Sequence, residues 1–185
     1  SSSPSERENV FIIDINLLNN KTLQQQDTTN AEDKFFADYP SLGRVDHWPI
    51  HGSIFNASTL SKKVRRDFID TFALWDGDKL PKLLKNLHEY IHGDGNVGGA
   101  SKNDTIIVLV HCMSGDDRTG EVMGSYAMQY LGYNASEAFK WDTEIALRPP
   151  LGPNRLMMQW YCYWLEKKGS PHGSYSSLGC DEMFF

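Results

Sequence analysis

The sequence has few cysteines, no long apolar run and no surplus of positive charge. Its three cysteines are too few to hold a domain together as a disulfide scaffold. No apolar stretch approaches the length that spans a membrane, so stable membrane insertion is not expected. The net charge of −6 provides no general attraction to nucleic acid, so a nucleic-acid partner is not expected either.

The chain does contain enough apolar residues to fold. Hydrophobic residues make up 40% of its 185 positions and aromatic residues 12%, which argues against disorder. This length predicts a single domain over residues 1–185. Residues 1–9 are polar and are expected to fray. Residues 169–185 are expected to form a mobile tail or a segment docked by Met183, Phe184 and Phe185.

The most informative stretch is Thr105–Gly120. Ile106–Val110 is a short, unbroken apolar run, which predicts a strand buried on both faces. A helical pattern starts near Arg118, with one apolar side formed by Val122, Met123, Tyr126, Ala127, Tyr130 and Leu131. Between strand and helix lies a glycine-bearing loop, so successive backbone N–H groups and the helix N-terminus can converge on one anion.

Two side chains of this loop indicate its chemistry. Cys112 begins the loop and Arg118 closes it six positions later. Arginine offers a planar two-pronged donor that matches phosphate oxygens. The guanidinium and the converging amides also stabilise a thiolate, so the pKa of Cys112 is expected well below that of a free thiol. Such a thiolate is a nucleophile directed at phosphorus. The competing interpretation of Cys112 is a small buried apolar residue, which leaves the spacing of Arg118 unexplained.

The run His111-Cys112-x-x-Gly115-x-x-Arg118-Thr119-Gly120 resembles the active-site loop of the cysteine-dependent protein tyrosine phosphatase superfamily. The resemblance implies an α/β fold with a central, mostly parallel sheet flanked by helices. It implies a phosphocysteine intermediate on Cys112, with Arg118 holding the phosphoryl oxygens and Thr119 assisting breakdown of the intermediate. His111 and Gly120 would support the loop, and neither a metal nor another cofactor is implied. The phosphate would be bound by Met113, Ser114, Gly115, Asp116, Asp117 and Arg118.

A phosphatase of this kind also needs an acid that protonates the leaving oxygen. Asp46-His47-Trp48-Pro49 resembles the acid loop of the inositol-phosphate and lipid branches of the superfamily. Aligned instead with the Trp-Pro-Asp loop of the tyrosine-specific branch, Trp48–Gly52 has isoleucine where the acid should be. We favour Asp46 as the acid. The alternative is that Asp46 caps a turn and that Asp76 or Asp78 supplies the acid from another loop.

The resemblance covers about Arg44–Glu166. Near its end, Arg148–Glu166 is similar to the dual-specificity branch, in which Arg-Pro, Pro-Asn and a glutamine-containing helix pack beneath the phosphate loop. Asn154 would brace that loop or simply cap the last helix, and Gln159 matches the glutamine.

The loop interior bears on the substrate. Asp116 and Asp117 would repel a phosphate dianion unless they are screened or turned outward. A pocket this poor in lysine argues against a substrate crowded with phosphates. We therefore expect a protein tyrosine or dual-specificity phosphatase that acts on phosphorylated protein or another phosphomonoester, with inositol phosphates or phosphoinositides as the second candidate.

Two interpretations from other classes remain. His88-Glu89-Tyr90-Ile91-His92 satisfies the H-E-x-x-H pattern of zinc peptidases, but Gly98 stands where the third ligand of the extended pattern should be. If Asp46 is not the acid, the chain could instead be a catalytically weak phosphate-binding module.

The compartment is not decided by sequence. Asn20, Asn56, Asn103 and Asn134 each begin an N-x-Ser/Thr triplet, which favours a secreted or lumenal protein. A reactive thiolate slightly favours the cytosol. Whether Cys162 and Cys180 pair cannot be inferred from their positions.

The hydrophobic patterns predict the remaining elements. We expect a strand at Val10–Ile15, a loop at Asn16–Asn30, and helices at Ala31–Asp38, Ser58–Trp75, Lys79–His92, Ala135–Leu147 and Arg155–Lys168.

Overall fold

The computed structural model describes residues 9–75, 77–93, 97–169 and 177–184, with residues 183 and 184 described by their backbone alone. Within these ranges the fold is α/β, as expected from the sequence, with a parallel sheet of three strands. The strands are β1 (Val10–Asn16), β2 (Gly43–His47) and β3 (Thr105–His111), and their order across the sheet is β2-β1-β3.

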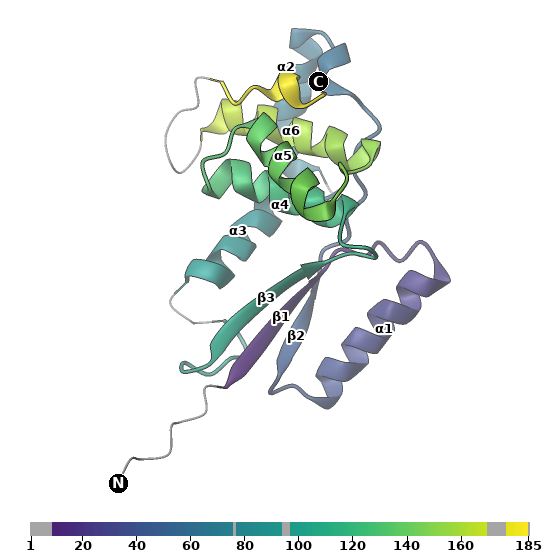
Figure 1. The fold of residues 1–185 in the computed structure, drawn as a ribbon, viewed down its shortest axis with the longest axis vertical. Helices are drawn as coiled ribbons and strands as arrows, with labels where there is room; N and C mark the ends of the chain where they lie inside the picture. Colours follow the sequence, from purple (N-terminus) through teal and green to yellow (C-terminus); the bar gives the residue numbers. More distant parts are fainter. Residues whose placement is uncertain (1–8, 76, 94–96, 170–176, 185) are drawn as a thin grey trace.

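Six α-helices accompany the sheet in the described ranges. They are α1 (Leu23–Asp38), α2 (Lys62–Thr71), α3 (Leu80–His92), α4 (Asp117–Tyr130), α5 (Ala135–Ala146) and α6 (Gly152–Lys168). Short 3₁₀ turns lie at Ala57–Thr59, Phe72–Leu74 and Cys180–Phe184. Figure 1 shows α1 and α3 flanking the sheet, while α2, α4, α5 and α6 gather beyond one end of it. None of the helices described is both long and apolar enough to cross a bilayer.

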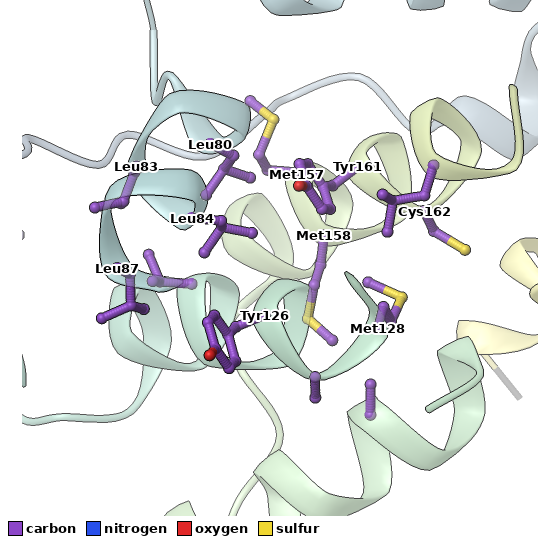
Figure 2. Close-up of a cluster of buried hydrophobic side chains, with 14 of the residues drawn as sticks. Leu80, Leu83, Leu84, Leu87, Tyr126, Met128, Met157, Met158, Tyr161 and Cys162 are labelled. Carbon is purple, nitrogen blue, oxygen red and sulfur yellow. The ribbon is translucent and has the colours of Figure 1, made fainter. Parts of the chain in front are cut away.

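The core of the helical part lies between α3, α4 and α6. Leu80, Leu83, Leu84 and Leu87 recur at helical spacing on α3 and are all buried. Figure 2 shows these leucines facing the aromatic and sulfur-containing side chains of α4 and α6. This packing fixes α4, and therefore the loop that precedes it, relative to the rest of the molecule.

The prediction that strand β3 is buried on both faces is wrong. Ile107 and Leu109 are 48% and 50% exposed. The reason is topological, because β3 is an edge strand and α1 packs against β2 at the opposite edge. Side chains of paired residues on β1 and β3 point to the same side of the sheet. On the side where α1 lies, the side chains of β3 are left exposed because the helix covers the opposite edge.

Helix α1 extends into the stretch that was predicted as a loop. It begins at Leu23, where the Thr22 side chain caps it by accepting a hydrogen bond from the Gln25 amide. Its buried residues are Gln25 and Thr29, so the helix has no apolar stripe that a periodicity analysis could detect. The helix expected at 58–75, by contrast, is shorter than predicted, since only Lys62–Thr71 is α-helical.

The C-terminal segment is docked on α6. Cys162 and Cys180 form a disulfide, and Leu178 and Cys180 are buried. The Gln159 amide donates to the carbonyl of Cys180 and to the Ser58 hydroxyl. The side chains of Met183, Phe184 and Phe185, expected to dock this segment, lie outside the described residues.

Reduction of this bridge should destabilise the fold. The cysteines are 18 residues apart, and a closed loop of this size is expected to contribute about 3 kcal/mol through the entropy of the unfolded chain. Denaturant unfolding in the Cys112→Ser background, with and without reductant, measures the effect without interference from the free thiol. Equal unfolding midpoints in the two conditions would show that the bridge contributes nothing.

Candidate active site

The candidate site lies at the carboxyl ends of the strands, where the three chain segments continue side by side. The Leu17 amide donates to the carbonyl of His111 at 2.9 Å. The Trp48 amide donates to the carbonyl of Asn16 at 2.9 Å, and the Ile50 amide to that of Leu17 at 3.2 Å. This edge is where open parallel sheets place their ligands. The segments after β1 and β2 therefore border the loop that follows β3.

The loop Cys112–Arg118, here the cysteine loop, closes around the sulfur of Cys112. The thiol is free and half-buried. Burial alone would raise its pKa, but the proximity of Thr119 and of the backbone amides of Ser114 and Gly115 more than offsets this effect. Together they lower the pKa of Cys112 below that of an ordinary thiol. The positive φ of Gly115, +84°, permits the turn that brings these amides inward.

Arg118 stands at the start of α4 beside Thr119. It is half-buried, and its positive charge lies near enough to act on the carboxylates of Asp117 and Glu121. Its guanidinium donates no hydrogen bond to the described residues. Met113, Ser114 and Gly115, at the outer turn of the loop, are exposed. The loop therefore presents accessible amides together with a cation.

The two acids of the loop are both paired with Arg148. Its guanidinium donates to Asp117 at 2.7 and 3.0 Å and to Asp116 at 2.9 Å. Asp117 also accepts the amide of Leu151 at 2.7 Å. The hydrogen bond from Arg148 is the main reason that the pKa of Asp117 is lowered. Arg148 therefore partly screens the repulsion between these acids and a bound phosphate. It belongs to the Arg-Pro segment that the resemblance placed beneath the phosphate loop.

A third acid, Asp142 of α5, lies against the same cluster and was not predicted. It is buried, and its carboxylate is so close to Gly120 that a Cβ there would lie 2.6 Å from an Asp142 oxygen. Burial, followed by the charges of Asp116 and Asp117, raises the pKa of Asp142 to about 6. The sequence signal for such a role is weak, because a single aspartate on an amphipathic helix is usually solvated.

Asp142→Asn should stabilise the protein at neutral pH and above. The folded-state pKa of about 6 lies above the ordinary 3.8, so the folded chain binds this proton more tightly than the unfolded chain does. Protonated Asp142 therefore contributes its full share to the free energy of unfolding below pH 3.8, and this contribution is lost as the pH rises through 6. Asparagine removes that loss, so we expect a gain of about 1–2 kcal/mol at neutral pH, after allowing for solvent screening.

Unfolding free energies measured across this pH range test the effect of Asp142→Asn. The matched control is Glu144→Gln, which neutralises an exposed acid on the same helix and should change stability by less than about 0.5 kcal/mol. A gain that persists unchanged at low pH would show that the carboxylate charge is not its cause.

A buried polar cluster joins the cysteine loop to two other segments. Glu121 of α4 is completely buried, and burial together with the charge of Asp78 raises its pKa well above the ordinary value. It accepts a hydrogen bond from the Asn154 side chain at 2.8 Å. Asp78 in turn accepts the amides of His51 and Gly52 at 2.6 and 2.7 Å. The cluster ties the first turn of α4 to α6 and to the segment after β2.

Sequence analysis named Asn154 and Asp78 but missed Glu121. The only sequence signal that Glu121 is buried was its position directly before Val122, at the margin of the apolar stripe of α4. Asn154 lies near the start of α6, and its side chain is used to hold Glu121 rather than to cap that helix. Gln159 lies further along α6, and its hydrogen bonds go to Ser58 and Cys180 rather than to the cysteine loop.

Asp46 lies near the end of β2, on the sheet face covered by α3. It shares a row with Ile15 and Val110, so its backbone is two strand spacings, roughly 10 Å, from β3. Its carboxylate accepts hydrogen bonds from Arg44 at 2.9 Å and from the Tyr90 hydroxyl at 2.8 Å. In this conformation both partners belong to the sheet and α3. Of the alternative acids, Asp78 is in the buried cluster, and Asp76 lies outside the described residues.

With this geometry established, comparison with known proteins adds no relative. No family model matches the chain, and no curated protein shows a significant match. The functional argument therefore depends on the arrangement of side chains and on the loop sequence.

In the H-E-x-x-H pattern, His88 is placed against aromatic side chains. The His88 ring stacks on Tyr130, with centroids 4.0 Å apart and planes within 5°, and its Nδ1 lies 3.1 Å from the Tyr126 hydroxyl. Glu89 lies 3.5 Å from the ammonium of Lys85. These contacts account for the polar and aromatic character of this face of α3.

Proposed function

We propose that this protein hydrolyses phosphate monoesters through a covalent intermediate on Cys112. The observation that carries the proposal is the placement of Cys112 and Arg118 at the two ends of one short loop between β3 and α4, where the nearby amides of Ser114, Gly115 and Thr119 lower the pKa of the Cys112 thiol although it is half-buried. A sulfur held in this way is ionised more readily and points into a ring of anion-binding donors. The resemblance of the loop sequence to the cysteine-dependent protein tyrosine phosphatases supports the same chemistry.

The proposed reaction has two steps. The phosphoryl group binds the loop amides and the Arg118 guanidinium, and the Cys112 thiolate attacks phosphorus as the bond to the leaving oxygen breaks. An acid donates a proton to that oxygen. Water then forms a new P–O bond, the S–P bond breaks, and the Thr119 hydroxyl stabilises the departing thiolate. The water proton returns to the acid, which restores the starting state.

The preferred substrates are phosphotyrosine-containing or mixed phosphoproteins. Arg148 is occupied by Asp116 and Asp117, which leaves Arg118 as the cation of the loop. One phosphate fits this charge better than several adjacent phosphates do. Inositol phosphates and phosphoinositides remain the second candidate, on the resemblance of Asp46-His47-Trp48-Pro49. A catalytically weak phosphate-binding module is favoured by one observation, which is that Asp46 is already bonded to Arg44 and Tyr90.

Hydrolysis of an aryl phosphate, measured with and without a chelator, tests the function directly. We expect turnover that the chelator does not change. Turnover that the chelator abolishes would contradict a thiolate mechanism, and phosphate binding without turnover would identify the weak module. A panel of phosphotyrosine peptides, phosphoserine peptides and inositol phosphates then ranks the substrate classes by kcat/KM.

Asp46→Asn tests the assignment of the acid. We expect kcat to fall about 10²-fold with alkyl phosphates, whose leaving groups need a proton, and less than about tenfold with p-nitrophenyl phosphate. Tyr90→Phe is the matched control, because it removes a hydrogen bond to Asp46 but keeps the carboxyl group. An equal loss on both substrates would remove Asp46 from the acid role and direct attention to Asp78.

A further inference from the structure

Three side chains from separate elements meet on the α1 side of the sheet, beside the end of β3. Asp14 lies on β1, Glu32 lies on α1, and His111 is the last residue of β3. The His111 Nε2 lies 2.9 Å from Oδ1 of Asp14 and 3.6 Å from Oε1 of Glu32. Ligands that each lie about 2.1 Å from one metal ion, at tetrahedral or octahedral angles, are roughly 3.0–3.4 Å apart. The two distances therefore bracket the spacing that a shared ion requires.

The buried oxygen of Asp14 is the observation that points to an ion. The Asp14 side chain is 6% exposed, and its Oδ1 accepts no hydrogen bond from the residues that the structure describes. Its contact with the His111 ring is close in distance but not aligned as a hydrogen bond. A buried carboxylate oxygen without a partner is costly. Two atoms that approach closely without being hydrogen-bonded to each other are arranged as two ligands of one ion are.

The charges of this cluster also match a dication. The cluster contains two carboxylates, and a proton on His111 would compensate only one of them. Arg148 and Arg44 are paired with other acids, and His47 lies 2.9 Å from Asp33. A divalent cation bound by both carboxylates and a neutral imidazole brings the net charge of the cluster to zero, which removes the cost of burying an unbalanced carboxylate.

The surrounding contacts orient the side chains as those of metal ligands are oriented. The His111 Nδ1 lies 3.2 Å from the carbonyl oxygen of Cys112, and a proton donated there leaves the lone pair of Nε2 for an ion. The Asn16 side chain donates to Oε2 of Glu32, so Oε1 is the oxygen that faces His111. All three candidate ligands line a cavity of about 420 Å³, which gives an ion an entry path and leaves room for bound water.

We propose that Asp14, Glu32 and His111 bind one divalent transition-metal ion, for which zinc is the best fit. Imidazole favours zinc and its neighbours over magnesium and calcium, which take oxygen ligands. The site goes beyond the proposed function, because none of its ligands takes part in the two steps of hydrolysis. The ion clamps α1 to the sheet, which accounts for the docking of a helix whose buried residues, Gln25 and Thr29, are both polar.

Calorimetric titration with zinc chloride tests the site in the Cys112→Ser background, which removes the free thiol as a competing ligand. The protein is first treated with a chelator, which is then removed by dialysis. We expect one zinc ion per chain, with a Kd below about 10 μM. Adding Glu32→Gln or His111→Gln should weaken binding about 10²-fold, because losing a ligand costs at least as much as losing a group that supports one. Magnesium chloride should bind at least about 10²-fold more weakly than zinc.

Two matched controls and a second readout locate the ion. Asp33→Asn removes the acid next to Glu32 on α1 and should leave the zinc affinity unchanged. His92→Gln removes a histidine of the H-E-x-x-H pattern and should do the same. In denaturant unfolding, zinc should raise the midpoint of Cys112→Ser but not that of its Glu32→Gln derivative, because only a site in the folded state stabilises it. The Glu32 side chain is 22% exposed, so Glu32→Gln tests the proposal even if a change at Asp14 prevents folding.

No zinc binding by Cys112→Ser at about 1 mM zinc, or equal affinities with and without Glu32→Gln, would overturn the proposal. Loss of binding in His92→Gln would place the ion on α3 and would overturn it as well. Magnesium bound as tightly as zinc would show that the imidazole is not a ligand, with the same consequence.

These results are distinct from failure of the proposed function, because none of the measurements uses turnover. Zinc binding at this site in a protein that hydrolyses no phosphomonoester would sustain the metal site and refute the phosphatase. Turnover in a protein that binds no zinc would do the opposite.

Discussion

Cys112→Ser is expected to lower kcat for any phosphomonoester by at least about 10⁴-fold. The serine hydroxyl has a pKa far above that of a thiol, so the amides that stabilise a thiolate cannot produce an alkoxide at neutral pH. The donors themselves are unchanged by the substitution. The variant should therefore still bind inorganic phosphate, with an affinity within about threefold of that of the unmodified protein.

Steady-state kinetics and calorimetric titration with inorganic phosphate measure the two properties separately. If the Cys112→Ser variant kept substantial turnover, the nucleophile would have to be another residue. Loss of phosphate binding together with turnover would show that the sulfur is needed to hold the loop, rather than to attack. Equal denaturant midpoints establish that the variant is folded.

Arg118→Lys should lower kcat/KM by about 10²–10³-fold, although the positive charge is kept. An ammonium cannot donate the two parallel hydrogen bonds with which a guanidinium holds phosphoryl oxygens, and these bonds strengthen as charge develops in the transition state. Arg118→Ala should lose a further factor of about ten and most of the phosphate binding. The pH dependence of kcat/KM should keep its shape, because the thiolate is stabilised chiefly by donors other than Arg118.

Arg66→Lys is the matched control for Arg118→Lys, since it makes the same change on an exposed face of α2. It should leave kcat/KM within about twofold. An Arg118→Lys variant as active as this control would mean that Arg118 does not contact the phosphoryl group, and the proposed site would then lack its principal cation.

The parts of the fold that could be predicted from sequence are those with local signals. The cysteine loop was predicted because its determinants are consecutive: an apolar strand, glycine, arginine and a helix start. Helix α3 was predicted within one residue because its leucines recur at helical spacing. Of helix α1 only the second half, Ala31–Asp38, was predicted, because its first half depends on a capping threonine and on contacts with the sheet.

The rest of the candidate site depends on contacts between distant segments, which a pattern cannot reveal. Asp14 appeared only as a polar interruption of a strand, and Glu32 as one of several acids in a polar stretch; their meeting at His111 requires the strand order β2-β1-β3. Arg148 likewise pairs with Asp116 and Asp117 from a distant segment. From sequence these two acids were expected to repel a bound phosphate, and the pairing screens that repulsion. The exposure of β3 follows from its position at the sheet edge, which its apolar composition concealed.

The most direct test of the central claim is rapid-quench trapping of the phosphoenzyme. The protein is mixed with a ³²P-labelled aryl phosphate and quenched within the first turnover, and the label is mapped by peptide mass spectrometry. We predict close to one phosphate per active molecule, bound to the sulfur of Cys112 and missing from Cys112→Ser. Turnover with no trapped phosphate, or with the label on another residue, would contradict the account.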